Sequence, residues 1–162
     1  MLAVARFKDW NPQHFLDVSE MMCAMAIGYD WLYHIMNDVE KEEVRKALIE
    51  KGLEPCLNLD YCGHWLNSVS NWNQVCNAGC TFASIALIET HPEYAEKIIP
   101  RAVETINKPM KQYAPHGAYR EGPGYWCYGT AYNCLFLAAL EQHYGTDYGL
   151  VEKYPAFLKK FL

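Results

Sequence analysis

Amide side chains gather in residues 71–77, which read Asn-Trp-Asn-Gln-Val-Cys-Asn. If this segment is helical, Asn73 and Asn77 are one turn apart and Gln74 shares their face. Asn71 stands where an N-cap residue is expected. Two interpretations stay open. One is a helix cap with buried hydrogen bonds. The other is a carboxylate site at the helix N-terminus, where unpaired N–H groups carry partial positive charge.

A second polar segment, residues 117–129, combines a glycine-rich loop with tyrosines. Tyr125, Tyr128 and Tyr132 follow a three-then-four spacing, so they line one side of a helix. Tyr132 lies farthest from the loop and is expected to pack in the core. Tyr125 and Tyr128 lie near the loop, where a site is favoured.

Charged residues stand just before these tyrosines. Arg120 could grip a carboxylate or a sulfate with two parallel hydrogen bonds, and its charge would favour the ionised form of a nearby tyrosine. Without such a cation a tyrosine has a pKa of about 10, too high for a base at neutral pH. We expect Glu121 to orient Arg120 or a sugar hydroxyl. Tyr125 is the first candidate for a catalytic tyrosine and Tyr128 the second, and their spacing does not separate them.

Histidine and aromatic side chains flank both segments. His64 and His116 are expected in loops from which they could reach a cleft. The other histidines are expected at the surface or at helix ends: His14, His34, His91 and His143. Flat aromatic faces suit sugar stacking as well as core packing, and both interpretations stay open for four residues: Trp65, Trp72, Tyr119 and Trp126.

Composition narrows the class of protein. The net charge of −5 argues against a nucleic-acid partner, because phosphate binding needs a basic face. No stretch is long and apolar enough to cross a membrane. The seven cysteines and six histidines show no spacing typical of zinc. We therefore expect no metal or other cofactor, and we expect the cysteines to be small buried thiols.

Apolar periodicity predicts helices and no convincing strand. The first helix is expected over residues 14–35, and from Met21 to Tyr33 it is apolar nearly all round, so it should be buried on most faces. A cap formed by Asn37 or Asp38 should begin the second helix. Residues 58–70, rich in glycine, asparagine and aromatics, are expected to form a loop.

The third helix is expected over residues 72–90. Thr90 and Glu93 then predict a capping box for the fourth helix, with Pro92 just inside its start. Pro100 should kink the fourth helix or end it early.

A loop over residues 116–124 precedes a fifth helix over residues 125–144, which Gly145 should end. Inner and outer helices alternate along the chain. This pattern predicts an all-α fold of antiparallel helical hairpins, forming part of an incomplete α/α toroid, with residues 1–162 as a single helical domain.

The two polar segments resemble the α/α-toroid domain of heparinase II/III-like polysaccharide lyases. The likeness covers most of the chain in one register, and its opening part includes Trp10-Asn11-Pro12, Leu16-Asp17-Val18 and Gly28-Tyr29-Asp30-Trp31-Leu32.

The resemblance implies β-elimination on an acidic polysaccharide. A base removes the C5 proton of a uronic acid, and the C4 oxygen leaves. The uronate carboxylate must be neutralised as the enolate-like state forms, and the family does this with an Asn–His motif. Asn73 matches the Asn and Gln74 the His, which is a departure, because glutamine cannot titrate. The family's tyrosine, acting as base or acid, falls on Tyr125 or Tyr128. Substrate contacts are expected from Asn71, Asn77, Arg120, Glu121, His64, His116, Trp72, Trp126 and Tyr119.

The resemblance also implies partners and a location. We expect the chain to be a fragment of a larger toroid domain that lacks the family's C-terminal β-sandwich, so its partners include an acidic polysaccharide and the remaining domains of the parent protein. Exposed inner helices predict self-association. The family implies a periplasmic or secreted protein, although no signal peptide is visible at the start.

Two alternatives stay open. A glycoside hydrolase on an α/α toroid would need two opposed carboxylates, and Glu121 is the only acid in either polar segment, with Asp60 more distant. A non-catalytic carbohydrate-binding or structural module is favoured by Gln74 and by the absence of the partner domain from these residues.

Overall fold

Every regular element in the described part of the chain is helical. The computed structural model describes residues 1–157, and no strand occurs in that range. The predicted all-α class is therefore confirmed. Over the same residues, no helix is long and apolar enough to span a membrane.

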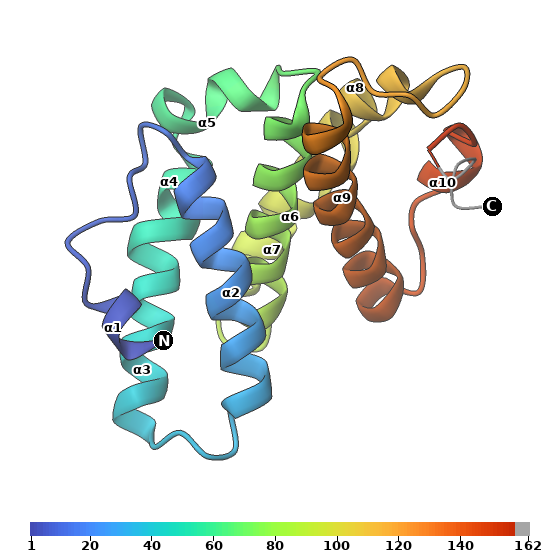
Figure 1. Ribbon diagram of the computed structural model, residues 1–162. Helices are drawn as coiled ribbons and strands as arrows, with labels where there is room; N and C mark the ends of the chain where they lie inside the picture. Colours follow the sequence, from blue (N-terminus) through green and yellow to red (C-terminus); the bar gives the residue numbers. More distant parts are fainter. Residues whose placement is uncertain (158–162) are drawn as a thin grey trace.

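Three long helices lie side by side in a central row: α2 (Leu16–Leu32), α6 (Asn71–Ala86) and α9 (Pro123–Tyr144). They run in the same direction, with their N-termini at the top of Figure 1, and α6 lies between the other two. Helices α3 (Asp38–Leu48) and α7 (Pro92–Thr105) run the opposite way. The chain therefore forms the antiparallel hairpins α2–α3 and α6–α7.

Helix α2 is shorter than the predicted 14–35. Its middle is buried on several faces, through Val18, Met22, Met25, Ala26 and Tyr29. The prediction that burial extends to Tyr33 is wrong, because Trp31 is 79% exposed and Leu32 and Tyr33 are each 40% exposed.

A capping box begins α3, as predicted. The side-chain oxygen of Asn37 accepts from the backbone N–H of Glu40 at 3.0 Å, and the carboxylate of Glu40 accepts from the backbone N–H of Asn37 at 3.0 Å. The π-helical segment η1 (Ile49–Leu53) and then α4 (Glu54–Leu57) follow α3 without a break.

The middle of the predicted loop over residues 58–70 is helical, so that prediction is wrong. Helix α5 covers Leu59–Leu66, and Asn58 caps it by accepting from the backbone N–H of Asp60 at 3.0 Å. Trp65 is fully buried in this helix. Burial of this kind, rather than intrinsic propensity, stabilises most short helices.

The start of α7 differs from the predicted capping box. The hydroxyl of Thr90 donates backwards to the carbonyl of Leu87 at 3.2 Å, so it does not cap the helix. His91 occupies the N-cap position without a side-chain cap bond, and Pro92 is the first helical residue, as predicted.

Helix α7 continues through Pro100, so Pro100 does not end it early; the alternative, a kink at Pro100, stays a prediction. It extends to Thr105, and Ile98 and Ala102 on its inner face are fully buried. Pro100 itself is exposed, so the carbonyl that loses its N–H partner can face water. Helix α8 (Asn107–Met110) and the 3₁₀ turn η2 (Lys111–Tyr113) follow.

Helix α9 ends at Gly145, as predicted, and Gly145 adopts a left-handed conformation with φ of 69°. Short helices lie at the two ends of the described chain, α1 (Leu2–Ala5) and α10 (Leu150–Lys153).

The cysteines are not all buried thiols. Cys23, Cys62 and Cys76 are buried and free, as predicted, but Cys127 and Cys134 are exposed. Cys56 of α4 and Cys80 of α6 form a disulfide, with their Cα atoms 6.6 Å apart. The sequence prediction failed for this pair because two helices that are distant in sequence bring the sulfur atoms together.

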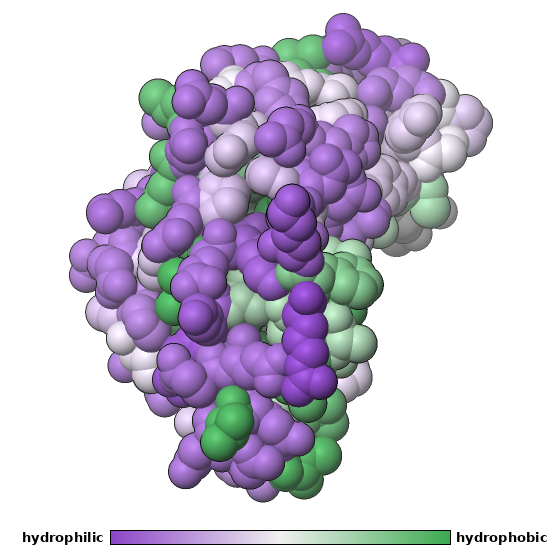
Figure 2. All heavy atoms as spheres, turned by 90° about the vertical axis from the view of Figure 1, so that its left-hand side faces the viewer, coloured by the Kyte–Doolittle hydropathy of each residue, from purple (hydrophilic) through white to green (hydrophobic). Residues whose placement is uncertain are grey.

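The lower end of the molecule exposes apolar side chains (Figure 2). They surround the α2–α3 turn and include Leu32, Ile35 and Val39, which are 40%, 79% and 77% exposed. Large exposed apolar patches mark contact surfaces on many proteins. Self-association through exposed inner helices stays a prediction.

Gly79 sets how closely α2 approaches α6. A Cβ atom built on Gly79 would lie 2.3 Å from the carbonyl oxygen of Ser19 and 2.7 Å from its Cα. Both are backbone atoms, so no side chain can move aside. The two helices of the row can therefore pack at this distance only because position 79 carries no side chain.

We expect Gly79→Ala to destabilise the fold by about 1–3 kcal/mol, the usual cost of overpacking a core. Gly63→Ala is the matched control, because Gly63 is also helical and its added Cβ meets nothing within 4 Å. Its expected effect is a gain of about 0.5–1 kcal/mol. Urea denaturation followed by circular dichroism measures both, and equal stabilities for the two variants would contradict the close contact.

Candidate functional site

The two polar segments lie at the same end of the central row. Residues 71–77 form the first turns of α6, and the loop before α9 ends beside them. The N-termini of α2, α6 and α9 all point to this end (Figure 1), so the partial positive charges of their dipoles add there. This end of the row is therefore suited to anions.

A carboxylate already occupies the N-terminus of α6. Glu121 accepts from the backbone N–H of Asn71 at 2.8 Å, and both of its oxygens lie 3.0 Å from the side-chain nitrogen of Asn71. Ser70, not Asn71, is the N-cap residue, and it makes no side-chain cap bond. The prediction that Asn71 caps the helix is wrong, because Glu121 supplies the capping carboxylate from across the chain. No ion pair between Glu121 and Arg120 is found in the described residues.

Asn73 and Asn77 are fully buried and bind protein groups. The side-chain nitrogen of Asn73 donates to the carbonyls of Trp65 and Leu66 at 3.2 and 3.1 Å, which satisfies the end of α5. The side-chain nitrogen of Asn77 donates to Asn73 Oδ1 at 2.8 Å and to Thr105 Oγ1 at 3.0 Å. These contacts support the interpretation of buried hydrogen bonding, and substrate contact by Asn73 stays a prediction.

Gln74 is also fully buried and links three elements. Its Nε2 donates to the hydroxyl of Tyr113 at 2.9 Å, and that hydroxyl lies 2.7 Å from Thr130 Oγ1 on α9. Its Oε1 lies against Gly129, where an added Cβ would come within 2.3 Å. A substrate carboxylate that reached Gln74 Nε2 would have to displace Tyr113. Nothing in the sequence around Tyr113 marks it as a member of this network.

Tyr128 pairs with an acid that the sequence analysis did not single out. Its hydroxyl donates to the carboxylate of Glu20 on α2 at 2.6 Å. Burial and the Glu20 carboxylate raise the pKa of Tyr128 far above its usual value. A cation was expected to lower this pKa, so the environment of Tyr128 acts in the opposite direction. Nothing in the sequence separates Glu20 from Asp17 and Asp30, the other two acids of α2.

Tyr125 and Tyr132, the two tyrosines of α9 on either side of Tyr128, differ in exposure. Tyr125, in the first turn of α9, is 57% exposed. Tyr132 is half-buried and packs edge-on against Tyr128, with ring centroids 5.3 Å apart. Burial, together with the charge of Glu20, raises the pKa of Tyr132 to about 12. The predicted packing role of Tyr132 is consistent with these contacts.

Trp72 lies between two imidazoles. The ring of His14 contacts it edge-on at 4.9 Å between centroids, and the ring of His64 does so at 5.3 Å. His64 lies on α5 rather than in a loop. Asp17 holds the His14 ring through a 2.7 Å contact with Nδ1. Burial raises the pKa of Asp17, but hydrogen bonds from His14 and Asn11 outweigh it and lower that pKa overall.

The remaining predicted residues lie in the loop before α9, except Trp126, which lies in the first turn of α9. Tyr119 is buried, and its hydroxyl donates to the carbonyl of Val69 at 3.2 Å. Trp126 donates from its indole nitrogen to the carbonyl of Gly117 at 3.0 Å. Both fix the loop through these bonds. Arg120 and His116 are exposed.

A hollow of about 690 Å³ lies at the opposite end of the central row of helices, between the last turns of α2, α6 and α9. Its lining includes Asp30, Trp31, Glu89 and His143. In the described residues, no group of three or more His, Cys, Asp or Glu side chains could hold a metal ion.

Two comparisons with known proteins found no match. No protein-family model matches the chain, and no curated protein matches it. The resemblance to a lyase family stays a prediction from the sequence.

We expect Glu121→Gln to destabilise the fold by about 1–2 kcal/mol, because it removes the charge that binds the N-terminus of α6. The exposed neighbouring variant Arg120→Gln should change stability by less than about 0.5 kcal/mol. Urea denaturation of both variants measures the difference. Equal stabilities would show that the carboxylate of Glu121 contributes nothing to the cap.

Proposed function

We propose that the chain is part of a polysaccharide lyase domain that acts on uronic-acid-containing polysaccharides by β-elimination. One observation carries the proposal: a carboxylate-binding helix N-terminus and a tyrosine kept in its protonated form lie at the same end of three parallel helices. Elimination from a uronate needs both groups, one for the carboxylate and one for the leaving oxygen.

The carboxylate is the first requirement. Its charge must be neutralised before the C5 proton can be removed. Asn71 holds the carboxylate of Glu121 through a backbone N–H and a side-chain amide, and the same donors suit a uronate carboxylate. In our proposal the substrate displaces Glu121, and the exposed Arg120 in the same loop grips the incoming anion.

The leaving oxygen is the second requirement. Tyr128 keeps its proton at neutral pH, as a tyrosine with the ordinary pKa of about 10 does. Burial and Glu20 raise that pKa further. We therefore assign Tyr128 the role of general acid, which protonates the C4 oxygen as it leaves. Removal of the C5 proton falls to another group at this end, and Tyr125 and His64 are the exposed candidates.

Gln74 has a positioning role in this mechanism. It cannot titrate, and its amide is bound to Tyr113. Its contact with Gly129, one residue beyond Tyr128, fixes the start of α9 against α6. Trp72, flanked by His14 and His64, offers an aromatic surface on which a sugar ring could stack.

The helix arrangement supports the rest of the proposal. Parallel inner helices with antiparallel outer helices are what an arc of an α/α toroid requires. The remaining domains of the parent protein would complete the ring, and the apolar end at the α2–α3 turn is where a further helical hairpin or a second copy would pack. The Cys56–Cys80 disulfide supports a periplasmic or secreted location.

A non-catalytic carbohydrate-binding module is the second candidate. It is favoured by the complete burial of Asn73 and Gln74, which leaves the family's amide motif bound to protein groups. A glycoside hydrolase is the third candidate, since Glu20 and Glu121 are two carboxylates at this end, but each is already bound to another side chain.

Incubation of the chain with a panel of acidic polysaccharides tests the proposal through the ultraviolet absorbance of a C4–C5 unsaturated uronate. We expect a rise that Tyr128→Phe reduces about a hundredfold or more, because the phenol proton is lost. Tyr132→Phe is the matched control, since it removes a neighbouring hydroxyl on the same helix, and it should retain most of the activity.

Other outcomes separate the alternatives. Binding of uronate oligomers without any rise would favour the non-catalytic module. Shortened chains without an unsaturated product would favour a hydrolase. Full activity of Tyr128→Phe would rule out its role as general acid.

A further inference from the structure

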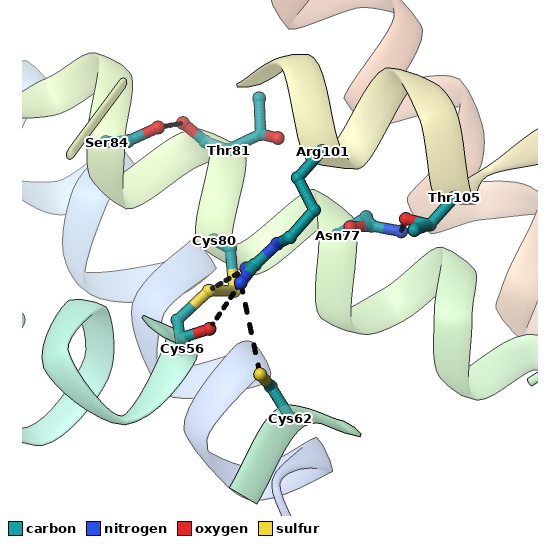
Figure 3. The surroundings of a disulfide bond; sticks show 8 residues. All are labelled: Cys56, Cys62, Asn77, Cys80, Thr81, Ser84, Arg101 and Thr105. Carbon is teal, nitrogen blue, oxygen red and sulfur yellow. Dashed lines mark hydrogen bonds between the residues drawn. A yellow bond between two sulfur atoms is a disulfide. The ribbon is translucent and has the colours of Figure 1, made fainter. Parts of the chain in front are cut away.

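Three cysteines and an arginine meet where four helices come together (Figure 3). Cys56 on α4 is bonded to Cys80 on α6, while the free thiol of Cys62 approaches from α5. Arg101 reaches them from α7. All three cysteines are fully buried.

The guanidinium of Arg101 lies directly against the sulfur atoms. Its Nη2 donates to Cys56 Sγ at 2.9 Å, and its Nη1 donates to the carbonyl of Cys56 at 2.9 Å. Cys62 Sγ lies farther from Nη1, at 3.9 Å. The guanidinium also lies over the ring of Trp65, 5.8 Å from its centroid. Arg101 is therefore aimed at one sulfur of the disulfide in particular.

The charge of Arg101 has no carboxylate partner in the described part of the chain. Burial lowers the pKa of Arg101, and Cys62 opposes that effect. Arg101 is partly buried, and charges withdrawn from water are normally paired with an opposite charge. Here the anion that the surroundings can generate is a thiolate, and Cys56 Sγ is the nearest sulfur atom.

We propose that the Cys56–Cys80 disulfide is a redox-active site that exchanges with dithiol reductants, and that Arg101 stabilises Cys56 as the leaving thiolate. The inference does not depend on the proposed lyase activity. Cations beside a cysteine favour its thiolate, and a stabilised reduced form makes a disulfide more oxidising.

The exchange proceeds in two balanced steps. A thiolate of the dithiol attacks Cys80 Sγ, and the electron pair of the S–S bond passes to Cys56 Sγ, which becomes the ion-pair partner of Arg101. The second thiol of the dithiol then attacks the mixed disulfide. This step releases Cys80, which takes up a proton, and it leaves the dithiol oxidised to its own disulfide. Because both sulfurs are buried, the reductant enters through a local opening of the α4–α5 segment.

Reduction has a structural consequence at the upper end of the row. The disulfide ties α4 to the central helix α6, and α5 follows directly from α4. Since α5 carries His64 against Trp72, reduction loosens the segment that positions this pair. The redox state of Cys56 and Cys80 therefore controls how firmly the candidate site is held.

The midpoint potential of the wild-type chain, measured as a function of pH in dithiothreitol buffers, tests the proposal. Alkylation and peptide mass spectrometry identify the state of each cysteine. If Cys56 is a thiolate in the reduced protein, reduction takes up one proton between pH 6 and pH 8, so the potential should change by about 30 mV per pH unit. Uptake of two protons would give about 59 mV per pH unit, and that slope would overturn the proposal.

Arg101→Met and Arg101→Lys form the matched pair of variants. The methionine variant should lower the equilibrium constant for reduction about tenfold, which is about 30 mV, whereas the lysine variant keeps a cation and should stay near the wild type. An unchanged potential in a folded Arg101→Met protein, or a bond from Cys56 to Cys62 instead of Cys80, would also overturn the proposal. If the Arg101→Met variant does not fold, the pH dependence of the wild-type midpoint potential tests the proposal by itself.

Discussion

The close contact of helix α6 with both of its neighbours in the row determines the rest of the structure. On one side Gly79 allows α6 to touch the backbone of Ser19, and on the other Gly129 allows α9 to approach Gln74. Both contacts occur where a Cβ atom would clash, so the spacing of the three parallel helices is set by missing side chains rather than by large apolar ones. Their helix N-termini consequently lie together at one end, which is the condition for a shared anion site.

Polar groups on a buried helix have to be bound, because an unpaired amide in the interior costs about 1–3 kcal/mol. The Nε2 atom of Gln74 meets this requirement by donating to Tyr113, whereas its Oε1 has no hydrogen-bond partner among the described residues. The hydroxyl of Tyr113 also contacts Thr130, so one chain of hydrogen bonds joins α6, the η2 turn and α9. Asn73 binds the end of α5 in the same way. The amide side chains of residues 71–77 therefore orient the helices that carry the exposed residues of the candidate site.

Much of the fold could be predicted from local patterns, while the site depended on contacts between distant residues. The Asn37 cap and the glycine stop at Gly145 were predictable, because each depends on a few neighbouring residues. Helix α5 was not, since its stabilisation comes from burial of Trp65 against other elements. Tyr128 and Glu20 are 108 positions apart, so no local spacing in the sequence predicts their hydrogen bond. Arg101 near the disulfide was missed for the same reason.

The charges at the upper end of the row separate two kinds of chemistry. Over α6, helix N–H groups and the amide of Asn71 hold a carboxylate, so negative charge is stabilised there. Between α2 and α9, the carboxylate of Glu20 and burial keep the proton on Tyr128, so negative charge on that oxygen is disfavoured. Tyr128, the second of the two tyrosines that the sequence offers as catalytic candidates, is therefore held as a hydrogen-bond donor, and the carboxylate that accepts from it comes from a helix that the motif does not include.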